Sequence, residues 1–153
     1  SMTEGLLAPV LIPGGFAVDD RGQVSFVNDF TFKGIKRFYQ VANFSTQTVR
    51  AFHGHMKEAK YIFVAAGSAL VAAVPMDDTE KPRKDKKVER YVLSARKPSM
   101  LYIPHGYANG FKVLEEGTVM LFFSTASVED SKKDDYRFPY DYWGNGVWEI
   151  ENR

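Results

Sequence analysis

Hydrophobic and polar residues alternate over short stretches along most of the chain, and glycine, proline and acidic residues separate these stretches. Alternation with a period of two is typical of β-strands that bury one face. Two prolines and the pair Gly14-Gly15 disfavour a helix in the apolar segment 6–16. The segment DDRG at 19–22 predicts a tight turn. The pattern then predicts strands over 23–30, 35–44, 48–52, 61–64, 69–74, 88–93, 100–103, 107–114 and 118–124.

Many short strands without a long stretch of period 3.6 predict an all-β protein, built as an antiparallel barrel or jelly roll. Residues 128–136 are the one segment that favours a helical turn, with Ser127 or Ser131 as its cap. The segment 136–153 is aromatic-rich and irregular, and we expect it to pack over one end of the barrel. The chain shows no internal repeat or linker, so a single domain is predicted over residues 1–153.

Composition narrows the function classes. A net charge of +1 gives no reason to expect nucleic acid or a membrane surface as partner. The charged segment 76–87 mixes acids with bases and is interpreted as a solvated loop. The sequence contains no run of eighteen apolar residues and no signal-peptide pattern, and its first two residues, Ser-Met, are interpreted as an expression scar. The absence of cysteine fits a reducing cytoplasm, where we expect the protein.

The segment 49–66 concentrates the candidate chemistry. Strand side chains alternate between faces, so His53 and His55 are expected to point the same way. Lys60 opens the next strand, and an antiparallel hairpin would return it towards the two histidines. Charged side chains are rarely buried unless they meet a counter-charge or a ligand. We therefore interpret this hairpin, which begins near Arg50, as the floor of a site.

A metal site is the first alternative. His53, His55 and Glu58, followed by Asn109, resemble the two-part motif of metal-binding cupin barrels. Asn109 stands where such cupins have a third histidine, and an amide is a poor ligand for a transition metal. We therefore expect no metal and no cofactor.

A closer resemblance covers residues 15–150. The turn at 20–22 (DRG), the element Arg50-x-x-His53 and the stretch IPHGYANGF at 103–111 follow one another in the order seen in dTDP-4-dehydrorhamnose 3,5-epimerases. Gln40, Lys60 and Trp148 fit the same order. The chain thus resembles a short, divergent member of this cupin-type family of sugar-nucleotide isomerases. The resemblance implies a cupin-type antiparallel jelly-roll barrel, and a homodimer in which an N-terminal strand completes the partner's sheet.

Epimerisation beside a ketone needs a base, a group that stabilises the enolate, and an acid on the other face. Histidine suits the first role because its pKa lies near working pH, so His53 is the expected base. Lys60 is expected to hold the enolate oxygen. Guanidinium groups bind phosphate oxygens in a bidentate way, which favours Arg21 and Arg50 for a nucleotide diphosphate. Gln40 and Asn109 complete the expected substrate contacts.

The chain lacks the tyrosine that the resemblance implies as the catalytic acid. The matching stretch 122–130 (FFSTASVED) has no tyrosine, and Val128 falls near the family's tyrosine position. The aspartate that would support the base belongs to a C-terminal segment that this sequence does not show. Tyr102 and Tyr107, on neighbouring predicted strands, are the candidate replacement acids.

Two alternatives to the epimerase stay open. Sugar-nucleotide 3,4-ketoisomerases carry an Arg-Gly-x-His-x-His element, which RAFHGH at 50–55 resembles with one substitution. In that interpretation His53 and His55 share the proton transfer. The second alternative is a barrel that binds a nucleotide sugar without catalysis, suggested by the missing tyrosine and histidine.

Overall fold

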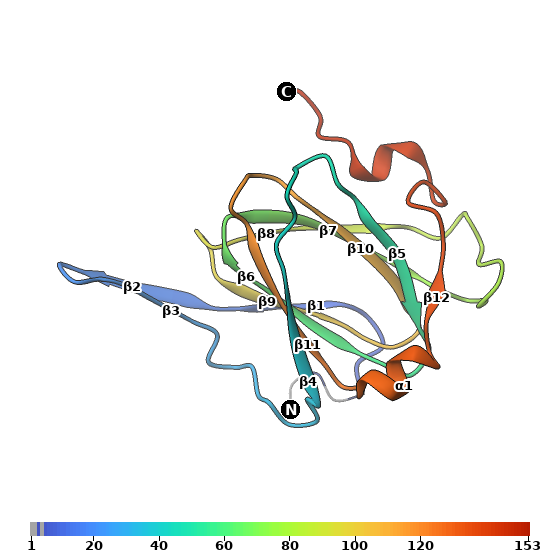
Figure 1. Ribbon diagram of the computed structural model, residues 1–153, viewed down its shortest axis with the longest axis horizontal. Coiled ribbons are helices and arrows are strands. Elements are labelled where there is room, and N and C mark those ends of the chain that lie inside the picture. Colours follow the sequence, from blue (N-terminus) through green and yellow to red (C-terminus); the bar gives the residue numbers. More distant parts are fainter. Residues whose placement is uncertain (1–2, 4) are drawn as a thin grey trace.

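The computed structural model describes residue 3 and residues 5–153. The described residues form strands, with one α-helix and one 3-10 helix near the C-terminus (Figure 1). The elements are β1 Val10–Pro13, β2 Gly15–Asp19, β3 Gly22–Phe26, β4 Arg37–Val41, β5 Arg50–His55, β6 Lys60–Ala66, β7 Ser68–Pro75, β8 Glu89–Ser94, β9 Ser99–Ile103, β10 Tyr107–Val113, β11 Val119–Ser124, α1 Val128–Lys132, β12 Tyr136–Arg137 and η1 Asn145–Trp148.

Two five-stranded antiparallel sheets face each other, as in a cupin-type jelly roll (Figure 1). Sheet I has the order β1-β9-β6-β11-β4, and sheet II has the order β12-β5-β10-β7-β8. The predicted all-β jelly-roll class is confirmed. The third sheet is the β2–β3 hairpin, which projects away from the two sheets (Figure 1). Its turn is the predicted one, and Gly22 there has a φ of 137°, which glycine adopts readily.

Successive strands often change sheet. β5 lies in sheet II and β6 in sheet I, so the hairpin predicted from His55 to Lys60 is wrong. β6 and β7, which only Gly67 separates, also lie in different sheets. Because of these crossings, residues that are close in sequence lie on opposite walls of the space between the sheets.

The main core fills the space between the two sheets. It contains only apolar side chains that are almost completely buried, because alternate residues of every central strand point inwards. Its members are Ile62, Val64, Ala69, Val71, Ala73, Leu93, Leu101, Ile103, Phe111, Val113, Met120 and Phe122.

The C-terminal segment covers the outer face of sheet II. Phe138, Trp143 and Trp148 pack there around Phe52, whose ring centroid lies 4.8 Å from that of Trp143. The indole nitrogens of the two tryptophans donate to backbone carbonyls, which satisfies them in this apolar layer. The expectation that this segment packs over one end of the barrel is therefore wrong, because it packs on the outer face of sheet II.

The outer face of sheet I is less covered. Phe32 and Phe38 are each about two-thirds exposed there, beside Phe123. The β2–β3 hairpin adds Val18 and Val24, which are also largely exposed. Within the described residues, no helix is long and apolar enough to cross a membrane.

Candidate active site

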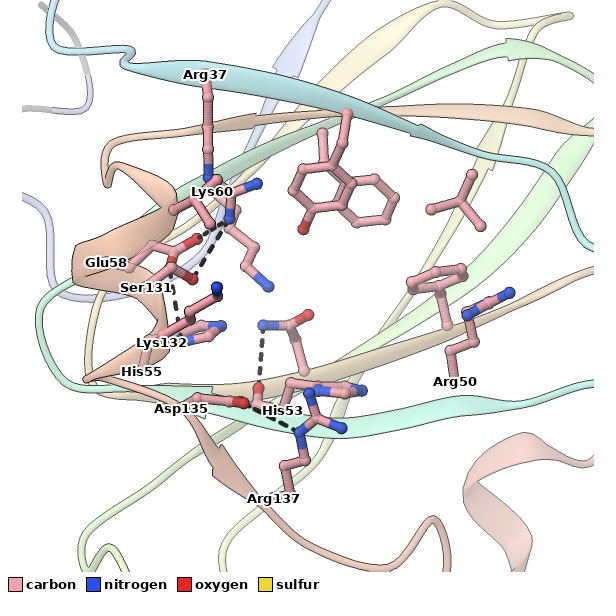
Figure 2. A pocket seen from close by; sticks show the side chains of 16 residues that line it. Arg37, Arg50, His53, His55, Glu58, Lys60, Ser131, Lys132, Asp135 and Arg137 are labelled. Atoms are coloured by element: carbon pink, nitrogen blue, oxygen red, sulfur yellow. Dashed lines mark hydrogen bonds and ion pairs between the residues drawn. The ribbon is translucent and has the colours of Figure 1, made fainter.

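A cavity of about 340 Å³ lies between sheets I and II, next to α1 (Figure 2). Strands of both sheets, α1 and the segment after it supply its walls. The lining residues are Arg37, Tyr39, Val41, Arg50, His53, His55, Glu58, Lys60, Asn109, Phe111, Phe122, Val128, Ser131, Lys132, Asp135 and Arg137.

The two histidines share one wall of this cavity. His53 and His55 are alternate residues of β5, so both side chains point inwards, as the sequence predicts. Asn109 of β10 stands opposite His53 in the strand register, and its side-chain nitrogen lies 3.4 Å from the His53 carbonyl oxygen. Arg50, at the start of β5, lines the same cavity and donates to the Asn43 side chain at 2.7 Å.

The charges around His53 favour its neutral form. Burial lowers its pKa to about 4, and the positive charges of Lys60 and Arg137 act in the same direction. The carboxylate of Asp135 opposes this effect only in part. His53 is therefore an unprotonated imidazole at neutral pH, which is the form that accepts a proton.

His55 is held by a backbone group. Its Nδ1 lies 2.6 Å from the carbonyl oxygen of Asp134, and 3.7 Å from a carboxylate oxygen of Glu58. Burial and the charge of Lys60 lower the pKa of His55, whereas its bond to the carbonyl raises it. Its other ring nitrogen, Nε2, is buried and has no hydrogen-bond partner among the described residues.

Lys60 reaches the cavity from sheet I and faces the histidines from across it (Figure 2). It is 7% exposed, and burial lowers its pKa to about 8, with Glu58 opposing the shift. Lys60 therefore carries a positive charge at neutral pH, close to the point where that charge is lost. A buried ammonium group in such a place stabilises developing negative charge.

Glu58 is tied into the wall beside Lys60. Its side chain is 1% exposed and accepts a hydrogen bond of 2.7 Å from Ser124. Arg37 lies 3.9 Å from the same carboxylate. Among the described residues, no group of three histidine, cysteine, aspartate or glutamate side chains is placed to hold a metal ion.

Tyr39 is a site residue that the sequence analysis missed. It belongs to β4, where Arg37, Tyr39 and Val41 face the cavity. Its ring stacks on Phe122 with centroids 4.9 Å apart and planes 4° apart. Burial, together with the nearby Glu58, raises its pKa to about 12, so the phenol keeps its proton. The alternation of side chains along this strand was the available signal: Tyr39 and Gln40 are neighbours, so they must point to opposite faces, and only one of them can face the cavity.

The segment after β11 adds further charged groups that sequence reasoning also missed. Lys132 lies on α1, and Asp135 and Arg137 accompany β12, with 3.1 Å between their charged groups. The short strand β12 brings Arg137 into register with His53. With these residues the cavity holds five arginine or lysine side chains against two carboxylates, and therefore favours an anionic ligand.

Four of the expected site residues lie elsewhere in this chain. Arg21 is at the tip of the β2–β3 hairpin and pairs with Asp19 at 2.6 Å. Gln40 is exposed, on the face of β4 that points away from the cavity. Tyr102 packs against Tyr61 at the outer face of sheet I, with the two rings tilted by 43°, and lines a different cavity there.

Tyr107 is also absent from the lining of the cavity. It is half-buried against the core between the sheets, and burial raises its pKa, with a further contribution from Glu89. The expectation that Tyr102 or Tyr107 supplies the acid is therefore corrected, because neither borders the space that holds His53.

The jelly-roll fold and a cationic cavity with two histidines together define a cupin-type protein that is suited to an anionic ligand. The family model of dTDP-4-dehydrorhamnose 3,5-epimerase matches residues 10–140. The chain therefore belongs to this family, whose members are isomerases.

One curated relative is the spore coat polysaccharide biosynthesis protein SpsL of Bacillus subtilis (strain 168), which is 31% identical over 94 residues. This match spans 61% of each chain.

Solved structures share the fold. The rmlC epimerase of Mycobacterium tuberculosis superposes with a TM-score of 0.73 at 15% identity, covering 96% of this chain and 75% of the other. The 3,4-ketoisomerase QdtA of Thermoanaerobacterium thermosaccharolyticum, solved as a double mutant in complex with TDP, gives 0.67 at 22% identity. That match covers 93% of this chain and 95% of QdtA.

Proposed function

We propose that this protein epimerises a nucleotide-linked 4-keto-6-deoxy sugar by removing a proton next to the ketone and returning it on the other face. One observation carries the proposal: His53 and Tyr39 line the same cavity from opposite sheets, with Lys60 beside them. Inversion at carbon needs a base and an acid on opposite faces of the sugar. This arrangement offers both.

The roles follow from the protonation states. His53, neutral at neutral pH, takes the proton from the carbon beside the ketone. The negative charge then moves to the ketone oxygen, where the ammonium group of Lys60 stabilises it. Tyr39, whose phenol is protonated, donates a proton to the carbon from the opposite wall. The reaction moves protons only, so its chemistry calls for no redox cofactor.

The remaining cations suit a nucleotide diphosphate. Arg50, Lys132 and Arg137 line the cavity around the two histidines. Their charges are expected to hold the phosphate oxygens, with Asn109 hydrogen-bonded to the sugar. The complex of QdtA with TDP supports a nucleotide of this kind as the ligand.

A homodimer is part of the proposal. The outer face of sheet I carries Phe32 and Phe38 largely exposed, and the projecting β2–β3 hairpin carries Val18 and Val24. Apolar surface of this kind is typical of protein interfaces. In the proposed dimer the hairpin reaches the partner's sheet, and Arg21 at its tip serves the partner's site. A cytoplasmic location is proposed with it, from the lack of cysteine.

The 3,4-ketoisomerase is the second candidate, and one observation favours it. His53 and His55 stand side by side on one wall, and His55 keeps a ring nitrogen without a partner. Moving a ketone to the neighbouring carbon requires a proton to be carried along one face. Two adjacent imidazoles suit that transfer, and Tyr39 would then have no role in it.

Proton NMR with dTDP-4-keto-6-deoxyglucose in deuterium oxide separates the candidates. Deuterium incorporation at C3 and C5 with inverted products supports the epimerase, whereas migration of the ketone to C3 supports the ketoisomerase. A substrate that binds but stays unchanged indicates a binding protein without catalysis.

His53→Asn tests the base: exchange as fast as in the wild type would show the assignment to be wrong. The assay is run with and without a chelator, and activity lost with the chelator would restore the metal alternative.

A further inference from the structure

Asp134 lies between α1 and β12 and is hydrogen-bonded to the turn after His55. Its side chain is almost completely buried, and its carboxylate accepts hydrogen bonds from three consecutive backbone N–H groups. Met56 and Lys57 donate at 2.8 Å, and Glu58 donates at 2.9 Å. Three charge-assisted bonds to one carboxylate fix the turn at 56–58 against residue 134.

The same residue also holds the imidazole of His55, through its main chain. The Asp134 carbonyl oxygen lies 2.6 Å from Nδ1 of His55. A carbonyl oxygen only accepts hydrogen bonds, so the neutral ring must carry its proton on Nδ1. Nε2 is then the nitrogen with the free lone pair, and no group of the described chain uses it.

We propose that Asp134 is a positioning residue: its carboxylate fixes the turn after His55 so that its carbonyl keeps His55 in the Nδ1–H tautomer, with Nε2 free to accept a proton. The catalytic consequence rests on the second candidate of the proposed function, the 3,4-ketoisomerase, because His55 takes part in the proton transfer only there. The structural part of the proposal is independent of that function.

The neighbouring ladder explains why the carboxylate is needed. β12 pairs with β5 at Tyr136–Gly54 and Arg137–His53, so the segment is anchored on one side of His55. Asp134 lies two residues before that ladder and anchors the other side. Without its carboxylate, three N–H groups lose their acceptor and the carbonyl is no longer held against the ring. The tautomer of a histidine is set by the hydrogen bonds of its ring nitrogens, and here the bond of Nδ1 to the Asp134 carbonyl sets it.

Long-range proton–nitrogen NMR correlations of the imidazoles test the structural part without any substrate. The chain has three histidines, so His53→Asn and His105→Gln variants identify the His55 signals. In the wild type we expect Nδ1 of His55 to be protonated and Nε2 bare. Asp134→Asn weakens the contacts with 56–58, and we expect signals of the Nε2–H tautomer to appear. Asp130→Asn is the matched control: Asp130 lines a cavity with Asp134, Lys57 and Glu58, but the N–H groups of 56–58 donate to Asp134 and not to it, so this variant is expected to keep the wild-type pattern.

Activity supplies the second measurement. If the protein is the 3,4-ketoisomerase, in which His55 shares the proton transfer, Asp134→Asn lowers kcat roughly 10- to 100-fold with KM nearly unchanged, as is common when a group that orients a histidine is lost. Asp134→Glu, which keeps the charge, is expected to recover part of the loss. Altered tautomers in Asp134→Asn with an inactive wild type would contradict the proposed function and leave the positioning role supported.

Three results would overturn the positioning role. They are an Nε2–H tautomer in the wild type, a wild-type pattern retained in folded Asp134→Asn, and loss of the fold in both Asp134 variants while Asp130→Asn stays folded. The last result would make Asp134 a structural residue only.

Discussion

Tyr39 and His53 line one cavity from opposite sheets: Tyr39 belongs to β4 of sheet I, and His53 to β5 of sheet II. In the proposed reaction, a sugar ring between them would present one face to an imidazole that accepts a proton and the other to a phenol that keeps one. The two strands are neighbours in sequence order but not in a sheet, so the chain crosses from one wall to the other between them. In the proposed epimerisation, this relationship supplies the acid that a tyrosine near residue 128 would otherwise provide.

Replacing Tyr39 by phenylalanine tests this relationship. Because the ring stacks on Phe122, Tyr39→Phe keeps the packing and removes only the hydroxyl group. We expect the rate of epimerisation to fall by about 10²- to 10⁴-fold, the usual contribution of a general acid. Deuterium exchange at C3 without inversion is expected to continue, because His53 can return the proton to the face from which it came. Proton NMR in deuterium oxide measures both quantities.

Tyr102→Phe is the control for that variant, since Tyr102 lies at the outer face of sheet I. It is expected to behave as the wild type. Equal rates of inversion in the wild type and in Tyr39→Phe would remove Tyr39 from the mechanism and leave the acid to another group.

The pH dependence of kcat/KM provides the second prediction. His53 must be neutral to act as base, so activity is expected to rise through its pKa of about 4. Lys60 must be charged to stabilise the enolate, so activity is expected to fall as pH rises through its pKa of about 8. The profile of kcat/KM reports the groups of the free enzyme. A bell with limbs near these two values is the expected outcome.

Lys60→Arg assigns the alkaline limb. A guanidinium group stays charged throughout the accessible range, so the fall above pH 8 is expected to disappear even if the maximum rate is lower. If the limb stays in place in Lys60→Arg, another group causes it.

The stability of the fold is expected to change with pH for the same physical reason. The pKa of Lys60 is about 8 in the folded protein and near 10.5 when the side chain is in water. Between these values the unfolded chain binds a proton that the folded chain does not, so the free energy of unfolding rises with pH. Over this whole range the effect is on the order of 3 kcal/mol. Tyr39, whose pKa is raised, acts with the opposite sign above pH 10.

Lys60→Met isolates this contribution. Urea titrations of both proteins at several pH values between 7 and 9.5 give the difference in free energy of unfolding. We expect Lys60→Met to be the more stable protein at pH 7, and its advantage to shrink as pH rises, while activity is lost at every pH. An advantage that does not depend on pH would mean that Lys60 is not titrating in this window.

The class of fold was predictable from the sequence, but the pairing of strands was not. Alternation and turn residues predicted most of the strands, including the one that carries Asn109, whereas the strand predicted over 48–52 stops before His53, which β5 contains. They gave no information on whether the chain turns back beside the same strand or crosses to the other sheet. The step from His55 to Lys60 was interpreted as a hairpin and is a crossing. A short connection permits both geometries, and long-range packing of the two sheets decides between them.

The site was predictable where residues lie close together in sequence. Arg50, His53, His55 and Lys60 were found because a cluster of polar groups in an apolar segment needs an explanation. Tyr39 and Arg137 escaped because each is an ordinary residue of a separate strand, and only the fold brings them to the cavity. For β12, two residues are too few to show alternation.

Arg21 is the residue that the proposed dimer places in the partner's site. In one copy it is 86% exposed at the tip of a hairpin that projects from the two sheets. The neighbouring side chains Val18 and Val24 are largely exposed as well. In the proposed dimer this hairpin contacts the partner, and the Arg21 side chain reaches the diphosphate in the partner's cavity.

Mixing two inactive variants tests that arrangement. Arg21→Ala lacks the proposed phosphate contact, and His53→Asn lacks the base, so each homodimer is expected to be nearly inactive. In a mixed dimer with two-fold symmetry, one of the two sites combines the intact His53 of one chain with the intact Arg21 of the other. After unfolding and refolding an equal mixture, about a quarter of the wild-type activity is therefore expected.

Refolding each variant alone is the control for recovery. If the mixture is no more active than its components while a dimer forms, Arg21 does not serve the partner's site. A protein that stays monomeric in light scattering removes the dimer from the proposal altogether.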